Sequence, residues 1–349
     1  MDEETCIKCG LCEKVCPILN QADKLPVQEV LAVKNPDDEE RMNSSSGGVF
    51  LPLAREVINK GGVVFGAVYD ESWEVHHVYA EKIEYVYPMM GSKYLQSRIE
   101  TAYRDAERFL KQGREVMFVG SPCQIAGLRT FLRNKEYPNL LAVDFLYHGV
   151  PSPGVWRRYL AETDGGYDAK ERSRRKATAG KNIVLSSDIH SNNPFMRGFL
   201  SDIYLRHSCY ECKCKNGVNH SDLTIADFGG INNVNPEFDD DKGVGLVLVN
   251  TQKGKVYFDK LGMVVHKSSL EIAQKHNGGF KEHTKAHPKR SLFFAMISKG
   301  KTIKDTVDIC LQIPFSSKIL NTTKRLLKKM VKKVLGKTGT TSIKVFLKR

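Results

Sequence analysis

The sequence has few cysteines for its length and no long apolar run, and each shortage excludes a class of protein. Nine cysteines in 349 residues are too sparse for a disulfide scaffold, and their C-x2-C clusters indicate metal ligation in a reducing compartment. No segment approaches the roughly 18–20 uninterrupted apolar residues of a membrane span. Residues 1–20 also lack the basic-then-apolar pattern of a signal peptide. We therefore expect a cytoplasmic protein that does not cross a membrane.

Acidic residues are absent after Asp308, and this tail supplies eleven of the thirteen net positive charges. Residues 1–308 are therefore nearly neutral, and specific nucleic-acid binding is not expected. In the tail, the stretch TKRLLKKMVKKVL divides apolar and basic residues between two sides of a helical wheel. We predict that residues 316–349 form a basic amphipathic tail. Residues 318–349 would bind either the inner face of an anionic membrane or an acidic partner protein.

The remaining sequence divides into three zones. Residues 1–20 form a cysteine module, and the polar range 21–43 is predicted to be a connector. From 44 to 315, short β-branched runs such as GGVVFGAVYD and EVMFVG alternate with helical patterns such as IETAYRDAERFLKQG. This alternation predicts an α/β (mixed α+β) catalytic domain behind a small N-terminal module. The basic stretch DAKERSRRKATAGK is predicted to be a surface loop within it.

The N-terminal module carries the strongest chemical signal, a C-x2-C-x2-C-x3-C-P run formed by Cys6, Cys9, Cys12 and Cys16. Such a run is typical of a ferredoxin-like [4Fe–4S] cluster, in which the cysteine before the proline ligates the other of two clusters. No second run of this kind exists here. Cys16 therefore closes the same cluster, a distant thiol closes it, or a preceding half-module is missing from this chain. A zinc site is disfavoured because zinc pairs normally have a longer spacer.

A second cysteine group lies in the α/β domain. The stretch GSPCQIAGL predicts a strand that ends at Gly120 and a helix capped by Ser121, with Pro122 and Gln124 completing the cap. Cys123 then lies in the first helical turn, where free N–H groups favour a thiolate. Together with the thiols of CYECKCK it makes four ligands for a second [4Fe–4S] cluster, namely Cys123, Cys209, Cys212 and Cys214.

Other interpretations of these residues remain open at this point. A zinc knuckle formed with His207 or His220 is the alternative for the CYECKCK stretch. Cys123 could be an inert residue at a strand–helix junction. Cys310 lies in a helical apolar pattern and is predicted to be a core residue.

The combination of motifs resembles the family of coenzyme F420 hydrogenase/dehydrogenase beta subunits. The resemblance rests on NSSSGGVF, GSKYLQS, GSPCQIAGL, VDFLYHGVPSP and CYECKCK with SDLTIADF, in that order, and extends from Cys6 to about residue 290. It implies a ferredoxin module on a domain that binds FAD and iron–sulfur. Such proteins move electrons between clusters, FAD and a hydride-accepting substrate. The related group includes bacterial members associated with polysaccharide biosynthesis.

The resemblance also implies roles for individual residues. A flavin pyrophosphate or substrate anion would bind at Ser45, Ser46, Gly47 and Gly48, before a predicted helix. Lys93 would stabilise the reduced flavin ring, Tyr94 would stack on it, and Gln96 belongs to the same motif. His148 would transfer a proton. Asp227 would accept hydrogen bonds from the cofactor. Each also has a structural interpretation, as a helix cap, a strand edge or a turn.

Two departures from the family pattern lead to a hypothesis. The resemblance leads us to expect two ferredoxin-type runs, whereas this chain has one. Tyr147 occupies a place where similar sequences have cysteine, and Cys214 a place where they have an aromatic residue. We therefore expect that Cys214 replaces the thiol absent at residue 147.

Two classes of function follow. The first is an oxidoreductase that takes electrons from ferredoxin or another electron-donor protein and passes them through one or two [4Fe–4S] clusters and FAD. Its substrate would be a small organic molecule, a deazaflavin or a sugar-linked compound. The second is a non-catalytic electron-transfer or scaffold subunit of a larger complex. Bound FAD with turnover distinguishes the first from the second.

Overall fold

The computed structural model describes residues 4–20, 26–163, 193–215, 220–280 and 283–312. The predicted surface loop at 168–181 and the basic tail at 316–349 lie outside these ranges. Among the described residues, no helix is long and apolar enough to span a bilayer.

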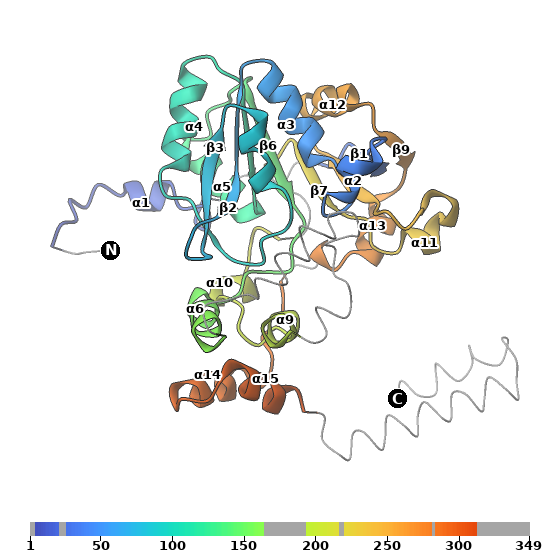
Figure 1. Cartoon of the computed structure of the whole chain (residues 1–349). Helices are drawn as coiled ribbons and strands as arrows, with labels where there is room; N and C mark the ends of the chain where they lie inside the picture. Colours follow the sequence, from blue (N-terminus) through green and yellow to red (C-terminus); the bar gives the residue numbers. More distant parts are fainter. Residues whose placement is uncertain (1–3, 21–25, 164–192, 216–219, 281–282, 313–349) are drawn as a thin grey trace, which may run out of the picture.

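A nine-stranded mixed sheet forms the body of the protein (Figure 1). The strands are β1 (Glu29–Lys34), β2 (Val63–Tyr69), β3 (Val75–Ala80), β4 (Ser97–Arg98), β5 (Val116–Gly120), β6 (Leu140–Phe145), β7 (Leu223–Asp227), β8 (Gly245–Val249) and β9 (Val264–Lys267). Their order is β4-β3-β2-β5-β6-β7-β8-β1-β9. The α/β expectation is confirmed.

The directions of the strands determine which loops lie at the same edge of the sheet. Strands β2, β5, β6 and β7 pair in parallel. Because β8 is antiparallel to both β7 and β1, strand β1 points the same way as these four. The carboxyl ends of five strands therefore meet at one edge, the usual ligand-binding edge of an α/β sheet.

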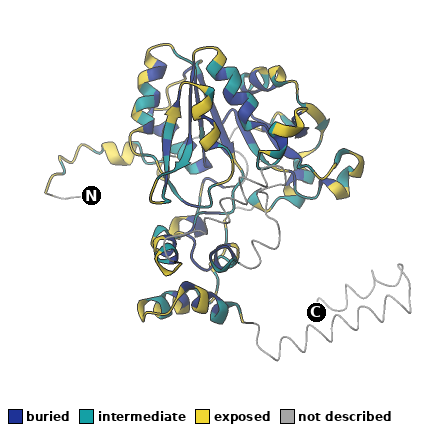
Figure 2. Ribbon diagram, viewed as in Figure 1, coloured by how far each residue is buried: buried dark blue, intermediate teal, exposed yellow. Residues whose placement is uncertain are grey.

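Helices cover both faces of the sheet. The helices are α1 (Leu11–Lys14), α2 (Asp38–Met42), α3 (Phe50–Asn59), α4 (Ala102–Lys111), α5 (Pro122–Phe131), α6 (Pro153–Glu162), α9 (Pro194–Leu200), α10 (His207–Tyr210), α11 (Ile231–Val234), α12 (Gln252–Phe258), α13 (Leu270–His276), α14 (Arg290–Ser298) and α15 (Ile303–Leu311). Helices α3 and α12 pack on one face. Helices α4 and α5 pack on the other, and α11 and α13 cover its far end. The central strands are buried on both sides (Figure 2), which explains their continuous apolar sequences.

A second core lies below the sheet, among α6, α9, α10, α14 and α15 (Figure 1). It is rich in aromatic residues, with Trp156, Phe195 and Tyr204 in ring contact. Cys310 is buried there, as expected of a core residue. Cys209, which lies on α10, is part of this core.

One expected boundary is wrong. The sequence predicts a connector over 21–43, but this range contributes β1, which lies between β8 and β9, and α2. The EVLAVK strand is short and flanked by polar residues, so its pattern resembles a linker. Its pairing on both sides is what makes it part of the core, because Leu31 and Val33 face one core while Val30 and Ala32 face another.

Candidate functional site

The predicted site residues gather at the carboxyl edge of the parallel strands. Cys123 follows β5, Tyr147 and His148 follow β6, and Asp227 ends β7. The loop that carries Ser46 follows β1. Residues far apart in the sequence thus share one edge because their strands run in the same direction.

The turn from β5 into α5 forms as its sequence predicts. The Gln124 side-chain oxygen accepts a hydrogen bond from the Ser121 N–H (2.9 Å), and the capping box is complete. The Cys123 Sγ lies 3.2 Å from the Ser121 hydroxyl. Burial nevertheless raises the pKa of the Cys123 thiol, and a charge on Cys212 raises it further. Desolvation therefore outweighs the expected effect of the helix N-terminus.

The three thiols of CYECKCK lie on α10 and the turn after it. The Cys209 Sγ accepts a hydrogen bond from the Val150 N–H (3.4 Å), and burial raises the pKa of this thiol. A hydrogen bond with Cys214 lowers the pKa of Cys212 to about 5 and raises that of Cys214. The contact therefore favours negative charge on Cys212 over negative charge on Cys214.

The fold brings these three thiols to Cys123. Charge on Cys123 raises the pKa of Cys209 and of Cys214, and charge on Cys212 acts on Cys123 in turn. The Tyr147 hydroxyl is in hydrogen-bonding contact with both Cys123 and Cys212, and Cys212 contacts Cys214. Four thiols from two distant segments therefore form one group, which we call the domain thiol group: Cys123, Cys209, Cys212 and Cys214.

Tyr147 lies within the domain thiol group. Its hydroxyl is 3.2 Å from the Cys212 Sγ. Burial raises its pKa far above the usual range, and charge on Cys123 and Cys212 adds to this. The side chain that stands in place of the expected cysteine is thus a neutral phenol in contact with the sulfur of Cys212.

Lys215 was missed by sequence reasoning, although it directly follows Cys214. It is only 4% exposed. Its ammonium donates to the His148 carbonyl (2.8 Å) and the Thr284 hydroxyl (3.0 Å) and lies 5.6 Å from the Tyr147 ring centre. Its charge lowers the pKa of Cys209 and of Cys212. A buried cation here offsets negative charge on the thiols.

The donor chemistry of the domain thiol group fits an iron–sulfur cluster. It offers four soft ligands, a backbone N–H donor at Cys209 and a buried cation, all of which favour an anionic iron–thiolate centre. Across the residues that the structure describes, no group of three or more His, Cys, Asp or Glu side chains is arranged to hold a single metal ion. In a cubane each thiolate binds a different iron, so its ligands surround a larger volume than one ion occupies.

The N-terminal module has a different environment. Its α1 is a single turn that follows Gly10 in a left-handed conformation (φ 68°). Cys9 and Cys12 are exposed, and Cys6 and Cys16 are half-buried. The neighbouring Ile7 is 86% exposed.

The serine–glycine stretch forms a tightly packed corner before α3. A Cβ at Gly47 would overlap the Gly245 nitrogen and the Val33 oxygen, so only glycine allows this approach. The Ser46 hydroxyl donates to the Val244 carbonyl (2.8 Å). It also contacts the Asp227 carboxyl, whose pKa is raised by burial and partly lowered by this contact. The fold therefore brings Ser46 and Asp227 together. The need for glycine at residue 47 is explained by the close packing of the backbone.

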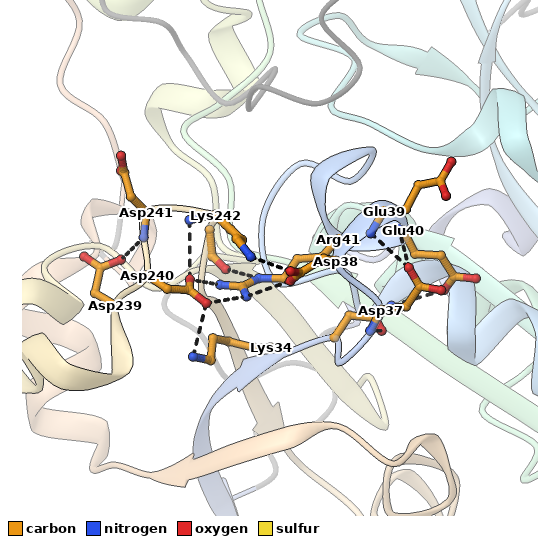
Figure 3. Close-up of polar contacts among 12 residues, drawn as sticks. Lys34, Asp37, Asp38, Glu39, Glu40, Arg41, Asp239, Asp240, Asp241 and Lys242 are labelled. Atoms are coloured by element: carbon orange, nitrogen blue, oxygen red, sulfur yellow. Dashed lines mark hydrogen bonds and ion pairs between the residues drawn. The ribbon is translucent and has the colours of Figure 1, made fainter.

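An ion pair holds this corner in place (Figure 3). The Arg41 side chain is 2% exposed. It donates to the Gly243 carbonyl (2.8 Å) and to both carboxyl oxygens of Asp240. The guanidinium lowers the pKa of Asp240 strongly, with help from Lys34. The pair connects α2 with the loop before β8. These two segments lie on either side of Ser46.

The GSKYLQS residues attach to several neighbours rather than to one cluster. The Lys93 ammonium donates to the Pro88 and Met90 carbonyls (2.9 and 2.8 Å), and burial lowers its pKa to about 7. The Tyr94 ring lies 6.0 Å from that of Phe199. The Gln96 side-chain oxygen accepts a hydrogen bond from Arg206.

His148 packs against the same phenylalanine as Tyr94. Its ring centre is 5.3 Å from that of Phe199, and its Nε2 lies 2.6 Å from the Asp202 carboxyl. The structure therefore makes Tyr94 and His148 neighbours of one ring. Asp202 gives His148 an acidic partner that sequence reasoning did not identify.

Comparisons with known proteins give consistent similarities. Residues 113–275 match the model of a family described as the C terminus of the beta subunit of coenzyme F420 hydrogenase/dehydrogenase, and residues 1–18 match a 4Fe-4S binding domain. A relative from Methanosarcina mazei, the F subunit of F(420)H(2) dehydrogenase, is 25% identical over 270 residues, which is 73% of this chain and 70% of the relative.

A solved structure, described as a xenon derivative of the F420-reducing [NiFe] hydrogenase complex from Methanosarcina barkeri, has a similar chain. It gives a TM-score of 0.49 at 14% identity and covers 79% of this chain and 94% of that one. At this level the likeness supports no further conclusion.

Proposed function

We propose that this protein is an iron–sulfur flavoprotein oxidoreductase, because residues 113–275 match the model of the coenzyme F420 hydrogenase/dehydrogenase beta-subunit family. Electrons enter from ferredoxin or another electron-donor protein at the N-terminal module and leave through FAD to a small organic substrate. The name of the Methanosarcina mazei relative favours a deazaflavin substrate over a sugar-linked one. The proposal requires a flavin because a flavin accepts single electrons from iron–sulfur clusters and transfers a hydride to the substrate.

The observation that carries the proposal is the domain thiol group with its buried cation. Lys215 is 4% exposed and its charge acts on Cys209 and Cys212. The His148 carbonyl and the Thr284 hydroxyl accept hydrogen bonds from this ammonium, and an anionic cluster would offset its charge further. A [4Fe–4S] cluster held by the domain thiol group would supply one-electron storage beside the carboxyl edge of the sheet.

FAD is proposed to bind at the corner formed by Ser45, Ser46, Gly47 and Gly48. Val49, which caps α3, provides no side-chain hydrogen bond to the helix. Pro52 has no N–H, so the N–H groups of Phe50 and Leu51 at the start of this ten-residue helix are the ones proposed to bind a pyrophosphate. The Ser46–Asp227 contact supplies hydroxyl and carboxyl groups for the polar parts of the cofactor.

Lys93 and His148 are proposed as the catalytic residues. Because burial lowers the pKa of Lys93 to about 7, its amine is charged below that pH and neutral above it. An ammonium near a reduced flavin would stabilise the anionic ring and raise the flavin potential at low pH. His148, paired with Asp202, is proposed to hold the proton that substrate reduction consumes.

The test begins with protein purified and reconstituted without oxygen. Iron, sulfide and flavin are quantified together, and oxidised F420 is then offered with dithionite-reduced ferredoxin. We expect about eight irons for two clusters, one FAD, and bleaching of the deazaflavin absorbance. Flavin-loaded protein that leaves F420 oxidised would remove the deazaflavin proposal. Absence of flavin from every preparation would remove the flavoprotein proposal.

The alternative function is an electron-transfer subunit without its own substrate site. It is favoured by the relative, whose name describes one subunit of a dehydrogenase, and by exposed apolar residues of the N-terminal module such as Ile7 and Leu19. Two clusters without flavin, together with activity only in the presence of a partner, would support this alternative.

A further inference from the structure

One side-chain contact joins the N-terminal module to the helix that begins at the domain thiol group. The Thr130 hydroxyl donates a hydrogen bond to the Val15 carbonyl (2.8 Å). Val15 directly precedes Cys16, and Thr130 lies on α5, the helix whose first turn carries Cys123. A single helix therefore contacts one cysteine group at its start and the other near its end.

This contact is not an ordinary threonine–helix interaction. A hydroxyl in a helix commonly bonds back to the preceding turn, and the Ala126 and Gly127 carbonyls both lie 3.1 Å from the Thr130 oxygen. A hydroxyl has one proton to donate, and the Val15 oxygen is the nearest of the three acceptors. Thr130 is only 5% exposed, so water does not compete freely for this contact.

The rise of an α-helix gives the span that the contact fixes. Seven residues separate Cys123 from Thr130, which corresponds to about 10 Å along the axis of α5. The module itself is short and largely exposed, with a one-turn helix. Its position relative to the domain therefore depends on contacts with the body, of which the Thr130–Val15 hydrogen bond is one.

We propose that Thr130 is a positioning residue that seats the N-terminal module on α5 and thereby sets the separation between the two cysteine groups. The proposal rests on the proposed function for its consequence, the passage of one electron between two clusters. In that transfer the N-terminal cluster is oxidised, the domain cluster is reduced, and a one-electron donor protein reduces the N-terminal cluster again. The seating of the module by Thr130 does not depend on that electron transfer.

The test compares Thr130→Val, which keeps the shape but removes the hydroxyl, with Thr130→Ser, which keeps the hydroxyl. Both are made in the full chain and reconstituted without oxygen. Hydrogen exchange is followed at the protected amides of the module, those of Lys14, Val15, Cys16 and Asn20. Thr130→Val should exchange about five- to tenfold faster, as expected for the loss of one hydrogen bond, and Thr130→Ser should exchange like the wild type.

Electron paramagnetic resonance of the dithionite-reduced protein gives the second measurement. Two reduced clusters held at a fixed separation interact magnetically, and Thr130→Val should weaken this interaction while the iron content stays unchanged. Far-UV circular dichroism checks that α5 still forms in each variant. Wild-type exchange rates in Thr130→Val would overturn the proposal, whatever the iron content.

The two proposals fail in different ways. If the wild-type protein binds iron for only one cluster, the two-cluster pathway of the proposed function is wrong. The exchange experiment still decides the role of Thr130. If two clusters form and Thr130→Val changes neither exchange nor the magnetic interaction, the seating proposal is wrong and the proposed function is unaffected.

Discussion

The two cysteine groups of this protein are built in opposite ways. The four cysteines of the N-terminal module lie within eleven residues and have exposed or half-buried side chains. The domain thiol group draws on segments more than eighty residues apart, and Cys209 and Cys214 are buried. The first group therefore depends on local spacing, and the second depends on the fold.

This difference determines what can tune each centre. Around the domain thiol group, a phenol, a backbone N–H and a buried ammonium act on the sulfurs. Groups that contact the ligands in this way adjust the affinity and potential of a metal centre. The exposed module is surrounded mainly by solvent, so its properties should respond to a docked partner.

The largest expected effect is the loss of one cluster in Cys214→Ser. Cys214 is 4% exposed and its thiol contacts that of Cys212, so we expect it to be the fourth ligand. Iron should fall from about eight to about four per chain, and Mössbauer spectra should lose one component. Cys310→Ala, at a buried cysteine in the lower core, is the matched control and should retain all iron.

A rescue experiment sharpens this prediction. Tyr147 contacts Cys212 within the same group, so the double variant Cys214→Ser with Tyr147→Cys should regain the second cluster. An unchanged second cluster in Cys214→Ser alone would contradict the ligand assignment. It would mean that Cys214 serves only as a hydrogen-bond donor to Cys212.

An intermediate effect is expected from the buried cation. Lys215→Met removes a positive charge close to the thiols, which is worth about 2 kcal/mol at an effective dielectric near 20, or on the order of 100 mV for one electron. The loss of a cation disfavours the more negative, reduced state, so the potential of the domain cluster should fall. Lys213→Met, at an exposed lysine two residues earlier, should leave it unchanged. Spectroelectrochemical titration measures both, and equal potentials would mean that Lys215 has no electrostatic role.

Sequence reasoning succeeded where the information is local. The capping box at Ser121 and the helix after the serine–glycine stretch depend on neighbouring residues, and both formed as predicted. Strand β1 was missed because its place in the sheet comes from pairing with β8 and β9, more than two hundred residues away.

The same limit applies to the site. The motif residues could be named from the sequence, but their neighbours could not. Lys215 carried one weak signal, its position after Cys214, and nothing in the sequence indicated that its ammonium is buried. The Arg41–Asp240 pair and the Thr130–Val15 contact join segments that only the fold brings together. The pKa of Cys123 went against expectation because burial, which depends on the whole fold, outweighed a local helix effect.

The smallest expected effect comes from the phenol that contacts Cys212. Tyr147→Phe keeps the ring and removes the hydroxyl that lies 3.2 Å from the Cys212 Sγ. A hydrogen bond to a thiolate favours the more negative state of a centre, so its loss should lower the potential of the domain cluster by roughly 20–60 mV, at most about a tenfold change for one electron. The iron content should not change. Tyr257→Phe, at a buried tyrosine on α12, controls for the loss of a hydroxyl elsewhere. If Tyr147→Phe loses the cluster, the phenol is needed for the cluster to form. The domain thiol group then consists of four thiols and Tyr147, and differs from the N-terminal module in its ligands as well as in its burial.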